Sequence, residues 1–381
     1  MKKIVHIDLN CFFVQAETLK DSSLKNKCVA VGYDGRRGVI STCSYPARKF
    51  GVHSGMPVSE AKRICPNLLV IPGHYQYYEN LSRNFFSFLK KKFPILEQAS
   101  IDECYIDMTD SLPTGNEYNY LFDLQMELYR VTNLKCSIGL GSNKFLAKMG
   151  SDYKKPLGLT IMSQDNIPKL LWPLDISKMY GVGKKTAPRL KDLGINTIGD
   201  LANCSDMKVR KTLGNLFDYL KSEANGYGDD VVSIEAFDPK SISAERTFSE
   251  DSTSYDELKS MIKSCSEDVA KELDYYQKDA ISIVIKLRSS DFKTRSKRMS
   301  LEKPINGSDQ VFFNAMMIFD KFYKGEPIRL IGVGVEKVVE RIASVKENKE
   351  IKKEDTIIQE LNQDMSFGGK IFLAKDLKSK K

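Results

Sequence analysis

Hydrophobic residues form a short β-rich run at the start of the chain, and beyond it they recur at helical spacing. Residues 3–9, KIVHIDL, are typical of a strand, and the following CFFVQAETLK is typical of a helix. Asp8 interrupts the apolar run and no small-residue cleavage site follows, so we interpret the segment as a strand of the fold rather than a signal peptide. Asp8 is therefore expected at an exposed strand end.

Two more acids lie at the tip of a predicted hairpin. Apolar side chains recur at helical spacing over residues 80–93, and ILEQAS and CYIDM then predict two short strands around Ile101-Asp102-Glu103. A helical stretch near 117–132, a strand at 135–141 and a helix from Ser142 follow. This alternation predicts an α+β unit whose strand ends gather on one face.

The pattern changes after Pro173. Helical segments interrupted by glycine, at 180–195 and 212–226, predict a small helical domain. A polar linker over about 227–242 precedes a helix at 254–273, and the strand-like runs ISIVIKLRS and IRLIGVGVEKV predict another α+β domain. From about Lys346 the chain is charged, and IIQELNQDM could form one helix.

Composition narrows the class of protein. A chain of 381 residues predicts two to four domains of roughly 100 residues each. It is 41% hydrophobic and 28% charged, and no apolar run approaches the roughly 20 residues of a membrane span, so we expect a cytoplasmic protein without a membrane anchor. Eight cysteines without a CxxC pair favour reduced thiols over a zinc site or disulfides. The net charge of +8 permits an anionic partner.

Three carboxylates from two strand regions suit a hard, oxygen-lined site for Mg²⁺. Asp8, Asp102 and Glu103 would repel one another without a cation between them. Two ions about 4 Å apart can activate an attacking 3′ oxygen and neutralise charge on a leaving pyrophosphate. The alternative is structural: Asp8 ends a strand, and the other two acids fill a turn.

Four ordered motifs favour the catalytic interpretation. HIDLNCFF at 6–13, STCSYPARKFGVHSGMP at 41–57, SIDECYID at 100–107 and KKPLG at 154–158 resemble, in order and spacing, those of Y-family DNA polymerases. The resemblance covers about residues 1–340 and is strongest to the bacterial DNA polymerase IV branch and related error-prone repair polymerases of Gram-positive bacteria. It implies a DNA-directed DNA polymerase of low fidelity that extends primers past damaged template bases.

The resemblance also implies an architecture, an α+β multidomain right hand. The expected parts are a ferredoxin-like palm (1–20 and 75–165), small fingers (21–74), a helical thumb with a helix-hairpin-helix (166–230), a linker (231–241), an α+β little finger (242–342) and a charged tail (343–381). The enzyme is expected to act as a monomer on primer-template DNA and deoxynucleoside triphosphates. Since no exonuclease domain is evident, we expect no proofreading.

By this resemblance the catalytic acids and metal ligands are Asp8, Asp102 and Glu103. The backbone carbonyl of Leu9 would assist one of two Mg²⁺ ions, for which Mn²⁺ can substitute. Asn10 departs from the family pattern, because many relatives have aspartate there. We expect catalysis to survive this change, with the contribution of a fourth negative charge lost.

Candidate triphosphate ligands lie in YPARKF. Tyr45 and Arg48 are three residues apart, so in a helix they share a face and can grip one triphosphate, although a solvated basic helix also fits the spacing. The resemblance assigns triphosphate binding to Tyr45, Arg48 and Lys155, with Thr42 also near the phosphates.

Sugar and base selection are assigned by the same resemblance. It places Phe12 and Phe13 beside the nucleotide, with Phe13 as the steric gate that leaves no room for a 2′-hydroxyl. Packing in the core is the alternative for both rings, and we favour it for Phe12. Val39, Ser41 and Gly55 fall where relatives form the roof over the nascent base pair, and such small residues would confine the template base loosely.

Two segments are candidates for holding DNA. The turn at Gly181 and Gly183, followed by Lys184 and Lys185, resembles a helix-hairpin-helix that meets phosphates through backbone NH groups, and an ordinary helix connection is the alternative. Residues 286–298, KLRSSDFKTRSKR, are rich in basic side chains, and the alternation in KTRSKR could place several on one strand face. A solvated loop is the alternative, and binding through the DNA backbone predicts steep salt dependence. The DNA contacts expected in the little finger are Arg246, Arg288, Lys293, Arg295, Lys297 and Arg298.

Two other function classes and one partner stay open. A sliding-clamp contact through Gln363 to Phe367 is a partial match only. A noncatalytic DNA-binding scaffold would keep the fold without the chemistry, but the intact acids argue against it. A nucleotide cyclase could use a similar palm with paired carboxylates, but the thumb and the basic domain argue against that function.

Overall fold

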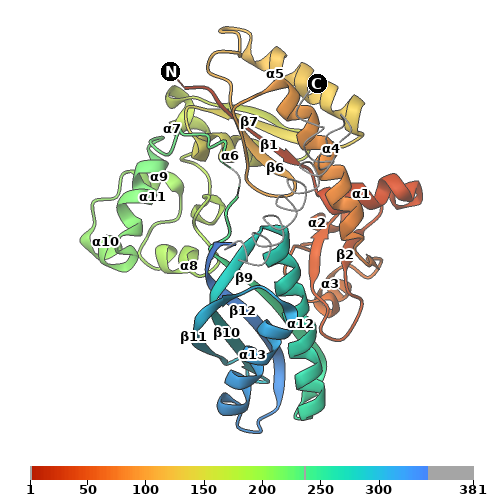
Figure 1. Ribbon diagram of the computed structural model, residues 1–381. Helices are drawn as coiled ribbons and strands as arrows, with labels where there is room; N and C mark the ends of the chain where they lie inside the picture. Colours follow the sequence, from red (N-terminus) through yellow and green to blue (C-terminus); the bar gives the residue numbers. More distant parts are fainter. Residues whose placement is uncertain (1, 236, 342–381) are drawn as a thin grey trace, which may run out of the picture. The chain divides into compact units, whose positions relative to one another are not determined.

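A computed structural model describes residues 2–235 and 237–341 of the chain (Figure 1). These residues form two compact units that divide after residue 236. The expected clamp-binding segment, Gln363 to Phe367, and the expected charged tail with its helix lie outside the described residues. Among the described residues, no helix combines the length and the apolar character that crossing a bilayer requires. None of the eight cysteines is in a disulfide.

The first unit is built around a five-stranded sheet, here called the palm sheet, with the strand order β5-β6-β1-β7-β8. All neighbours are antiparallel except β7 and β8, which are parallel. The strands are β1 (Ile4–Leu9), β5 (Leu96–Gln98), β6 (Glu103–Asp107), β7 (Cys136–Gly141) and β8 (Leu159–Met162). The helices are α1 (Phe12–Lys20), α4 (Tyr75–Lys92), α5 (Glu117–Thr132) and α6 (Lys144–Tyr153).

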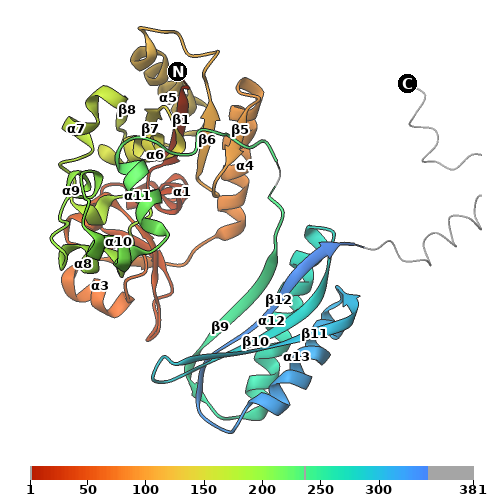
Figure 2. The ribbon, with the colours of Figure 1, turned by 90° about the vertical axis from the view of Figure 1, so that its left-hand side faces the viewer.

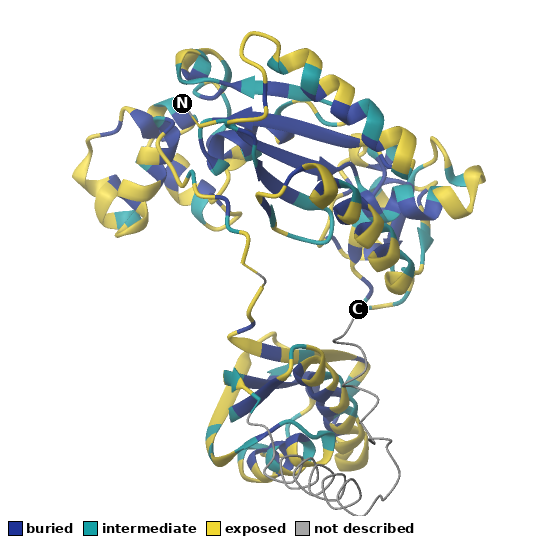
Figure 3. Ribbon diagram, turned by 45° about the horizontal axis from the view of Figure 1, so that its top comes forward, coloured by how far each residue is buried: buried dark blue, intermediate teal, exposed yellow. Residues whose placement is uncertain are grey.

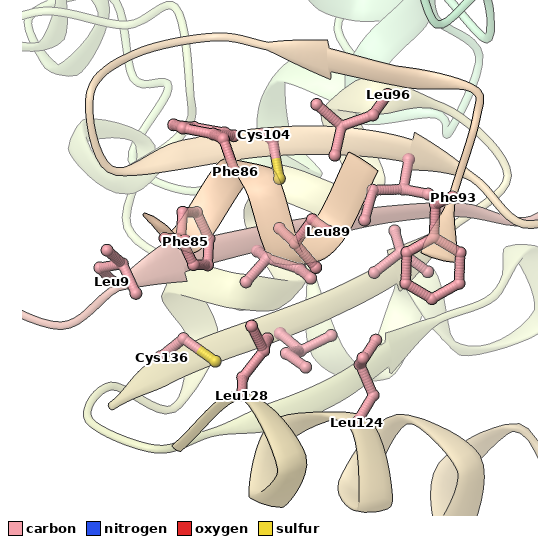
Figure 4. Packing of buried hydrophobic residues seen from close by; sticks show 14 of the residues in the cluster. Leu9, Phe85, Phe86, Leu89, Phe93, Leu96, Cys104, Leu124, Leu128 and Cys136 are labelled. Atoms are coloured by element: carbon pink, nitrogen blue, oxygen red, sulfur yellow. The ribbon is translucent and has the colours of Figure 1, made fainter. Parts of the chain in front are cut away.

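Strand alternation divides β1 between two faces of the palm sheet. Its odd-numbered residues, such as Ile7, join the large apolar core with side chains of α4 and α5, and Figure 4 shows Leu9, Phe85, Leu89, Leu124 and Leu128 meeting there. The even-numbered residues face α6 instead, because His6 contacts Ser151 and Asp8 contacts Lys148. The central strands are buried on both sides (Figure 3). Asp8 is therefore placed on the α6 side, where β1 ends.

Two glycines of β7 let α6 lie directly on the sheet. A Cβ at Gly139 would lie 1.9 Å from the carbonyl oxygen of Ala147 and 2.3 Å from the nitrogen of Ser151, both in α6. A Cβ at Gly141 would meet Leu146 at 2.5 Å. Since backbone atoms cannot move aside as a flexible side chain can, this close approach requires glycine. This close packing fixes the distance between α6 and the sheet, and it therefore brings Lys148 within contact distance of the acids.

A small sheet of order β3-β2-β4, with two short helices, lies within the residues that we predict to form the fingers. Its own apolar core contains Ile40, Val52, Val58 and Leu68. Ser44 caps the helix that carries Tyr45 and Arg48, because its hydroxyl accepts from the backbone NH of Ala47. The elements are η1 (Ser22–Leu24), β2 (Val29–Gly32), β3 (Ile40–Cys43), α2 (Tyr45–Lys49), α3 (Val58–Ile64) and β4 (Leu69–Ile71).

Short helices make up the segment that we predict to be the thumb, and its core includes side chains of α6 such as Phe145 and Met149. Val182 is buried in this core, while Gly181, Lys184 and Lys185 on either side of it are exposed. The elements are η2 (Gln164–Asn166), α7 (Ile167–Leu170), η3 (Ile176–Lys178), α8 (Thr186–Lys191), α9 (Ile198–Ala202), α10 (Met207–Leu213) and α11 (Leu216–Ala224).

The second unit is a four-stranded antiparallel sheet of order β11-β10-β12-β9 with two helices on one face (Figure 2). Alternate residues such as Ile283, Ile285 and Val333 face the helices and form the core. No helix of the described residues 237–341 lies on the other face, here called the open face. The elements are β9 (Ser241–Ser252), α12 (Tyr255–Tyr275), β10 (Lys278–Ser289), β11 (Thr294–Ile305), α13 (Ser308–Phe322) and β12 (Ile328–Glu340).

Most predicted elements are confirmed, with shifted ends. The helix expected over 80–93 begins earlier, at Tyr75, since its first turns also contribute buried aromatic side chains such as Tyr78. Within the expected linker, Val232 packs against Ile4, Tyr105 and Ala147, so the chain leaves the palm later than residue 231.

Replacing Gly139 by alanine is expected to lower the free energy of unfolding by about 1–3 kcal/mol, because the added methyl forces α6 away from β7. Denaturant titration measures the change. Gly183→Ala is the control, since a Cβ there meets no atom within 4 Å and the cost should stay within about 0.5 kcal/mol. Equal effects of the two substitutions would contradict the packing argument.

Candidate active site

A cavity of about 420 Å³ lies where the C-terminal end of β1 faces the fingers. It gathers most of the predicted metal and nucleotide residues, although they are far apart in the sequence. The predicted residues that line it are Asp8, Leu9, Phe12, Phe13, Ser41, Thr42, Tyr45, Arg48, Asp102 and Lys155, and they are joined by Cys11, Ser54 and Ile101. Glu103, Val39 and Gly55 are not among the lining residues.

The three predicted acids lie together at one strand end. Asp8 and Glu103 are direct partners across β1 and β6, and the backbone NH of Leu9 donates to the carbonyl of Asp102 at 2.9 Å. The carboxylates of Asp8 and Glu103 and the ring of His6 offer ligand atoms within 4.8 Å of one another. Asp102 is not a member of this closest group, and its Oδ1 accepts from Ser100 Oγ at 2.6 Å.

Two lysines balance the acids. Lys148 Nζ lies 2.6 Å from Glu103 Oε2 and 3.0 Å from Asp8 Oδ2, and Lys155 Nζ lies 2.7 Å from Asp8 Oδ2. Although burial opposes it, the charges of Asp8, Asp152 and Glu103 raise the pKa of Lys148. Contacts with His6 and Lys148 hold the pKa of Glu103 well below its usual range. Lys148 and Glu103 are thus both charged near neutral pH.

Burial favours the uncharged forms of Asp102 and His6. Burial, reinforced by the charges of Asp8 and Glu103, raises the pKa of Asp102. Burial lowers the pKa of His6, whose Nδ1 contacts Ser151 Oγ at 2.8 Å. His6 Nε2 lies 3.4 Å from Glu103 Oε2 and has no hydrogen-bond partner among the described residues. Both side chains would gain from a cation nearby.

Two of the predicted triphosphate ligands lie on one helix that lines the cavity. Tyr45 and Arg48 are both in α2, which confirms that they are on a helix, and the guanidinium lies 5.7 Å from the Tyr45 ring centre. Arg48 Nε donates to the carbonyl of Cys43 at 3.2 Å, which leaves its terminal nitrogens available. Burial raises the pKa of Tyr45, so the phenol stays a hydrogen-bond donor at neutral pH.

Phe13 is held in a stack of aromatic rings. It lies parallel to Tyr78 with ring centres 4.5 Å apart and meets the edge of Tyr75 at 5.8 Å. The hydroxyl of Tyr78 donates to the buried carboxylate of Glu17, which fixes the supporting ring. Phe12 is 2% exposed and packs in the palm core, as we favoured, although its edge reaches the cavity.

The predicted roof residues lie along one edge of the fingers. Ser41 lines the cavity and its hydroxyl lies 3.4 Å from that of Tyr75. Val39 is half exposed and pairs with Pro57 in an isolated bridge, and Gly55 has a φ of +82° and donates to the carbonyl of Ile40. The left-handed φ explains why glycine stands at 55.

The basic residues predicted to hold DNA are divided between the two faces of the second sheet. Strand register puts Arg288 and Arg298 on the open face, together with Lys286. Arg295, Lys297 and Arg246 point to the helix side, where Arg246 pairs with Asp268 of α12. The alternation in KTRSKR therefore does not gather all of its cations on one face. Lys293 lies in the preceding turn and pairs with Asp291.

Lys148, His6 and the Glu17–Tyr78 pair are site residues that the sequence reasoning missed. A signal for Lys148 was present, because helical spacing in NKFLAKMGSDY puts Lys148 one turn before Asp152, and the two side chains are 3.6 Å apart. Nothing local in the sequence marks Glu17 or Tyr78, which are 61 residues apart and meet only in the fold.

Comparison with known proteins agrees with this geometry. Models of the impB/mucB/samB family, of its C-terminal domain and of the IMS family HHH motif match residues 7–152, 239–349 and 164–195. The chain is 39% identical to DNA polymerase IV of Bacillus velezensis, over 94% of this chain and 89% of that protein. A Y-family DNA polymerase chimera of Dbh and Dpo4 has a TM-score of 0.77, and an insertion ternary complex of Dbh DNA polymerase has one of 0.63. Both are 25% identical and match 89% of this chain and 100% of theirs.

An acidic strand end beside a cationic finger helix, with a helix-hairpin-helix thumb, defines a DNA-directed DNA polymerase that uses divalent metal. Its fold is that of a right-hand polymerase with an additional C-terminal α+β domain. The chain belongs to the Y family of translesion DNA polymerases and, within it, to the DNA polymerase IV branch.

Lys148→Met is expected to cost about 3 kcal/mol of unfolding free energy without divalent cations, because two adjacent carboxylates lose their shared ammonium. Adding Mg²⁺ should raise the melting temperature of this variant more than that of the unmodified protein, since the ions then supply the missing charge. Thermal unfolding in EDTA and in Mg²⁺ measures both effects.

The matched control is Lys92→Met, which breaks an exposed pair with Glu127 and should cost less than about 1 kcal/mol. If both variants lose the same stability and respond equally to Mg²⁺, Lys148 is not the counter-ion of the acids.

Proposed function

We propose that this chain extends a DNA primer by two-metal nucleotidyl transfer, with low fidelity and without proofreading, at the cavity between β1 and α2. The observation that carries the proposal is the composition of one cavity. The carboxylates of Asp8 and Asp102 line it on the palm side together with the ammonium of Lys155, and Tyr45 and Arg48 line it toward the fingers. Clustered acids opposite clustered donors suit a metal-bound triphosphate.

The donor set fits two Mg²⁺ ions, for which Mn²⁺ can substitute. Asp8, Asp102 and Glu103 would hold the ions, with the carbonyl of Leu9 beside them, and these are the oxygen ligands that Mg²⁺ prefers. The raised pKa of Asp102 reflects burial beside two further acids, which a divalent cation would offset. Bound ions supply activation of the primer 3′ oxygen and neutralise charge on the departing pyrophosphate.

The finger residues and Lys155 act on the nucleotide. The Tyr45 hydroxyl and the terminal NH groups of Arg48 would donate hydrogen bonds to the triphosphate, with Thr42 close by. Lys155 adds a positive charge from the palm side, where it already contacts Asp8. Each of these groups would contact a phosphate and not the base, so binding of the triphosphate would not depend on which base the nucleotide carries.

Phe13 is proposed to exclude ribonucleotides. Its ring lines the cavity and cannot swing away easily, because Tyr78 and Tyr75 pack on it. Val39, Ser41 and Gly55 would form the roof over the nascent base pair. Small side chains there leave the template base loosely confined, which weakens geometric checking and permits damaged bases.

Primer-template DNA is the proposed second substrate, in keeping with the insertion ternary complex described for Dbh DNA polymerase. Gly181, Gly183, Lys184 and Lys185 would meet phosphates at the thumb. In the second unit, the open face of the sheet presents Arg288, Arg298 and Lys286, and the other predicted contacts, Arg246, Lys293, Arg295 and Lys297, lie off that face.

Replacing Asp102 by alanine is expected to reduce primer extension about 10²- to 10³-fold, because the site loses one of the acids that hold the ions. Extension of a labelled primer on an undamaged template with Mg²⁺ and all four deoxynucleotides measures the loss. Asp123→Ala is the matched control, since Asp123 is an exposed acid on α5, and it should leave the rate unchanged.

The same assay separates the competing functions. A noncatalytic scaffold would extend no primer with either protein, and a cyclase would consume nucleotide without a primer. Full activity of the Asp102→Ala variant would refute the assignment of the metal-binding acids.

Phe13→Ala is expected to raise the ratio of ribonucleotide to deoxynucleotide incorporation about 10- to 200-fold, because the ring no longer blocks the 2′-hydroxyl. Single-nucleotide insertion kinetics with matched triphosphates measure the ratio. Phe88→Ala is the control: Phe88 packs against the same palm core but does not line the cavity. An unchanged ratio in the Phe13 variant would mean that another group selects the sugar.

A further inference from the structure

Asn10 is a buried amide that joins two parts of the active site. It directly follows β1, two residues after Asp8, and is only 2% exposed. Its Nδ2 donates to Ser137 Oγ at 2.8 Å, and its Oδ1 accepts from the backbone NH of Leu157 at 2.8 Å. Because an NH can only donate, the atom facing Leu157 has to be the oxygen, so the two contacts fix the orientation of the amide.

The loop that Asn10 holds carries Lys155. Only Pro156 separates Leu157 from Lys155, whose ammonium lies 2.7 Å from Asp8 Oδ2 and lines the nucleotide cavity. Leu157 has a φ of +60°, a left-handed conformation that leucine rarely adopts unless its surroundings impose it. The position of the Lys155 side chain therefore depends on what restrains Leu157.

Three side chains restrain this backbone, and Asn10 is the most direct. Ser137 Oγ accepts from the NH of Gly158 at 3.2 Å, and Gln125 Nε2 lies 3.4 Å from the carbonyl of Leu157. Asn10 makes the shorter bond, at 2.8 Å, and also contacts Ser137. Asn10, Ser137 and Gln125 are all at least 97% buried, so their polar atoms depend on these protein partners.

An amide suits this position because one donor and one acceptor are needed at once. A carboxylate could accept from Leu157 but could meet Ser137 only if the hydroxyl turned to donate, and it would add a buried charge near Asp8. An apolar side chain would leave the Leu157 NH without this partner, and Ser137 Oγ would keep only the NH of Gly158. Both polar atoms of Asn10 are directed at protein groups, and Asn10 is not among the residues that line the cavity.

We propose that Asn10 is a positioning residue for the incoming nucleotide: it fixes the backbone at Leu157 and thereby aims the ammonium of Lys155 into the cavity. The inference rests on the proposed contact of Lys155 with the triphosphate. Asn10 thus acts through Lys155 on nucleotide affinity and not on the chemical step. The side chain at position 10 therefore affects nucleotide binding through its hydrogen bonds, and not only through the loss of the negative charge that an aspartate would carry.

Steady-state insertion with Asn10→Ala tests the inference. The KM for the deoxynucleotide should rise about tenfold, the equivalent of one well-formed hydrogen bond, while kcat changes less than about twofold. Asn225→Ala is the matched control. The Asn225 amide donates to the carbonyls of Ala202 and Lys221 in the thumb, so its loss should affect stability but not the KM. An unchanged KM in a folded Asn10→Ala protein would overturn the inference.

A double-variant cycle shows whether Asn10 acts through Lys155. Lys155→Ala should raise the KM, and adding Asn10→Ala to it should raise the KM no further. Additive effects would overturn the inference and leave the proposed role of Lys155 intact. An unchanged KM in Lys155→Ala alone would overturn that role and, with it, the inference.

Ser137→Ala decides the question if Asn10→Ala does not fold. This substitution deletes one oxygen atom, which contacts both Asn10 and the NH of Gly158. The KM should rise about threefold to tenfold with kcat unchanged. A KM equal to that of the unmodified protein would contradict the proposed restraint of the loop.

Discussion

Repulsion between carboxylates is the constraint on which the active site depends. Asp8 and Glu103 are placed opposite each other by the register of β1 and β6, and Asp102 follows at the same strand end. Like charges this close destabilise a fold unless cations balance them. Lys148 and Lys155 supply that balance. Lys148 is positioned by α6, which packs on two glycines of β7, and Lys155 lies in a loop that buried amide side chains restrain.

The sequence predicted the palm well because its signals are local. The run KIVHIDL, the tip at Asp102 and Glu103, and the helix over 117–132 all follow from periodicity, and the helix has the expected bounds. Tyr45 and Arg48 were placed on a helix by spacing. The family motifs then assigned roles that spacing alone left open, since the same residues fit a solvated basic helix.

What could not be predicted depends on contacts across the fold. The support of Phe13 by Tyr78 and Glu17 requires α1 and α4 to meet, and no local pattern encodes this. The division of Arg288 and Arg295 between two faces of a sheet requires the register of β10 and β11, which a run of alternating basic residues does not fix. Asn10 could be recognised as a departure from its relatives, but its partners Ser137 and Leu157 are more than 120 residues away in the chain.

The ion pairs of the second unit limit how firmly this unit can grip a nucleic acid. Arg298 lies 2.7 Å from Glu336, and Lys286 pairs with Glu245 on the same open face. A phosphate that binds either cation has to displace a carboxylate first, so each contact yields less than an unpaired cation would give. A surface that is partly neutralised in this way would release a bound polyanion faster than a surface of unpaired cations.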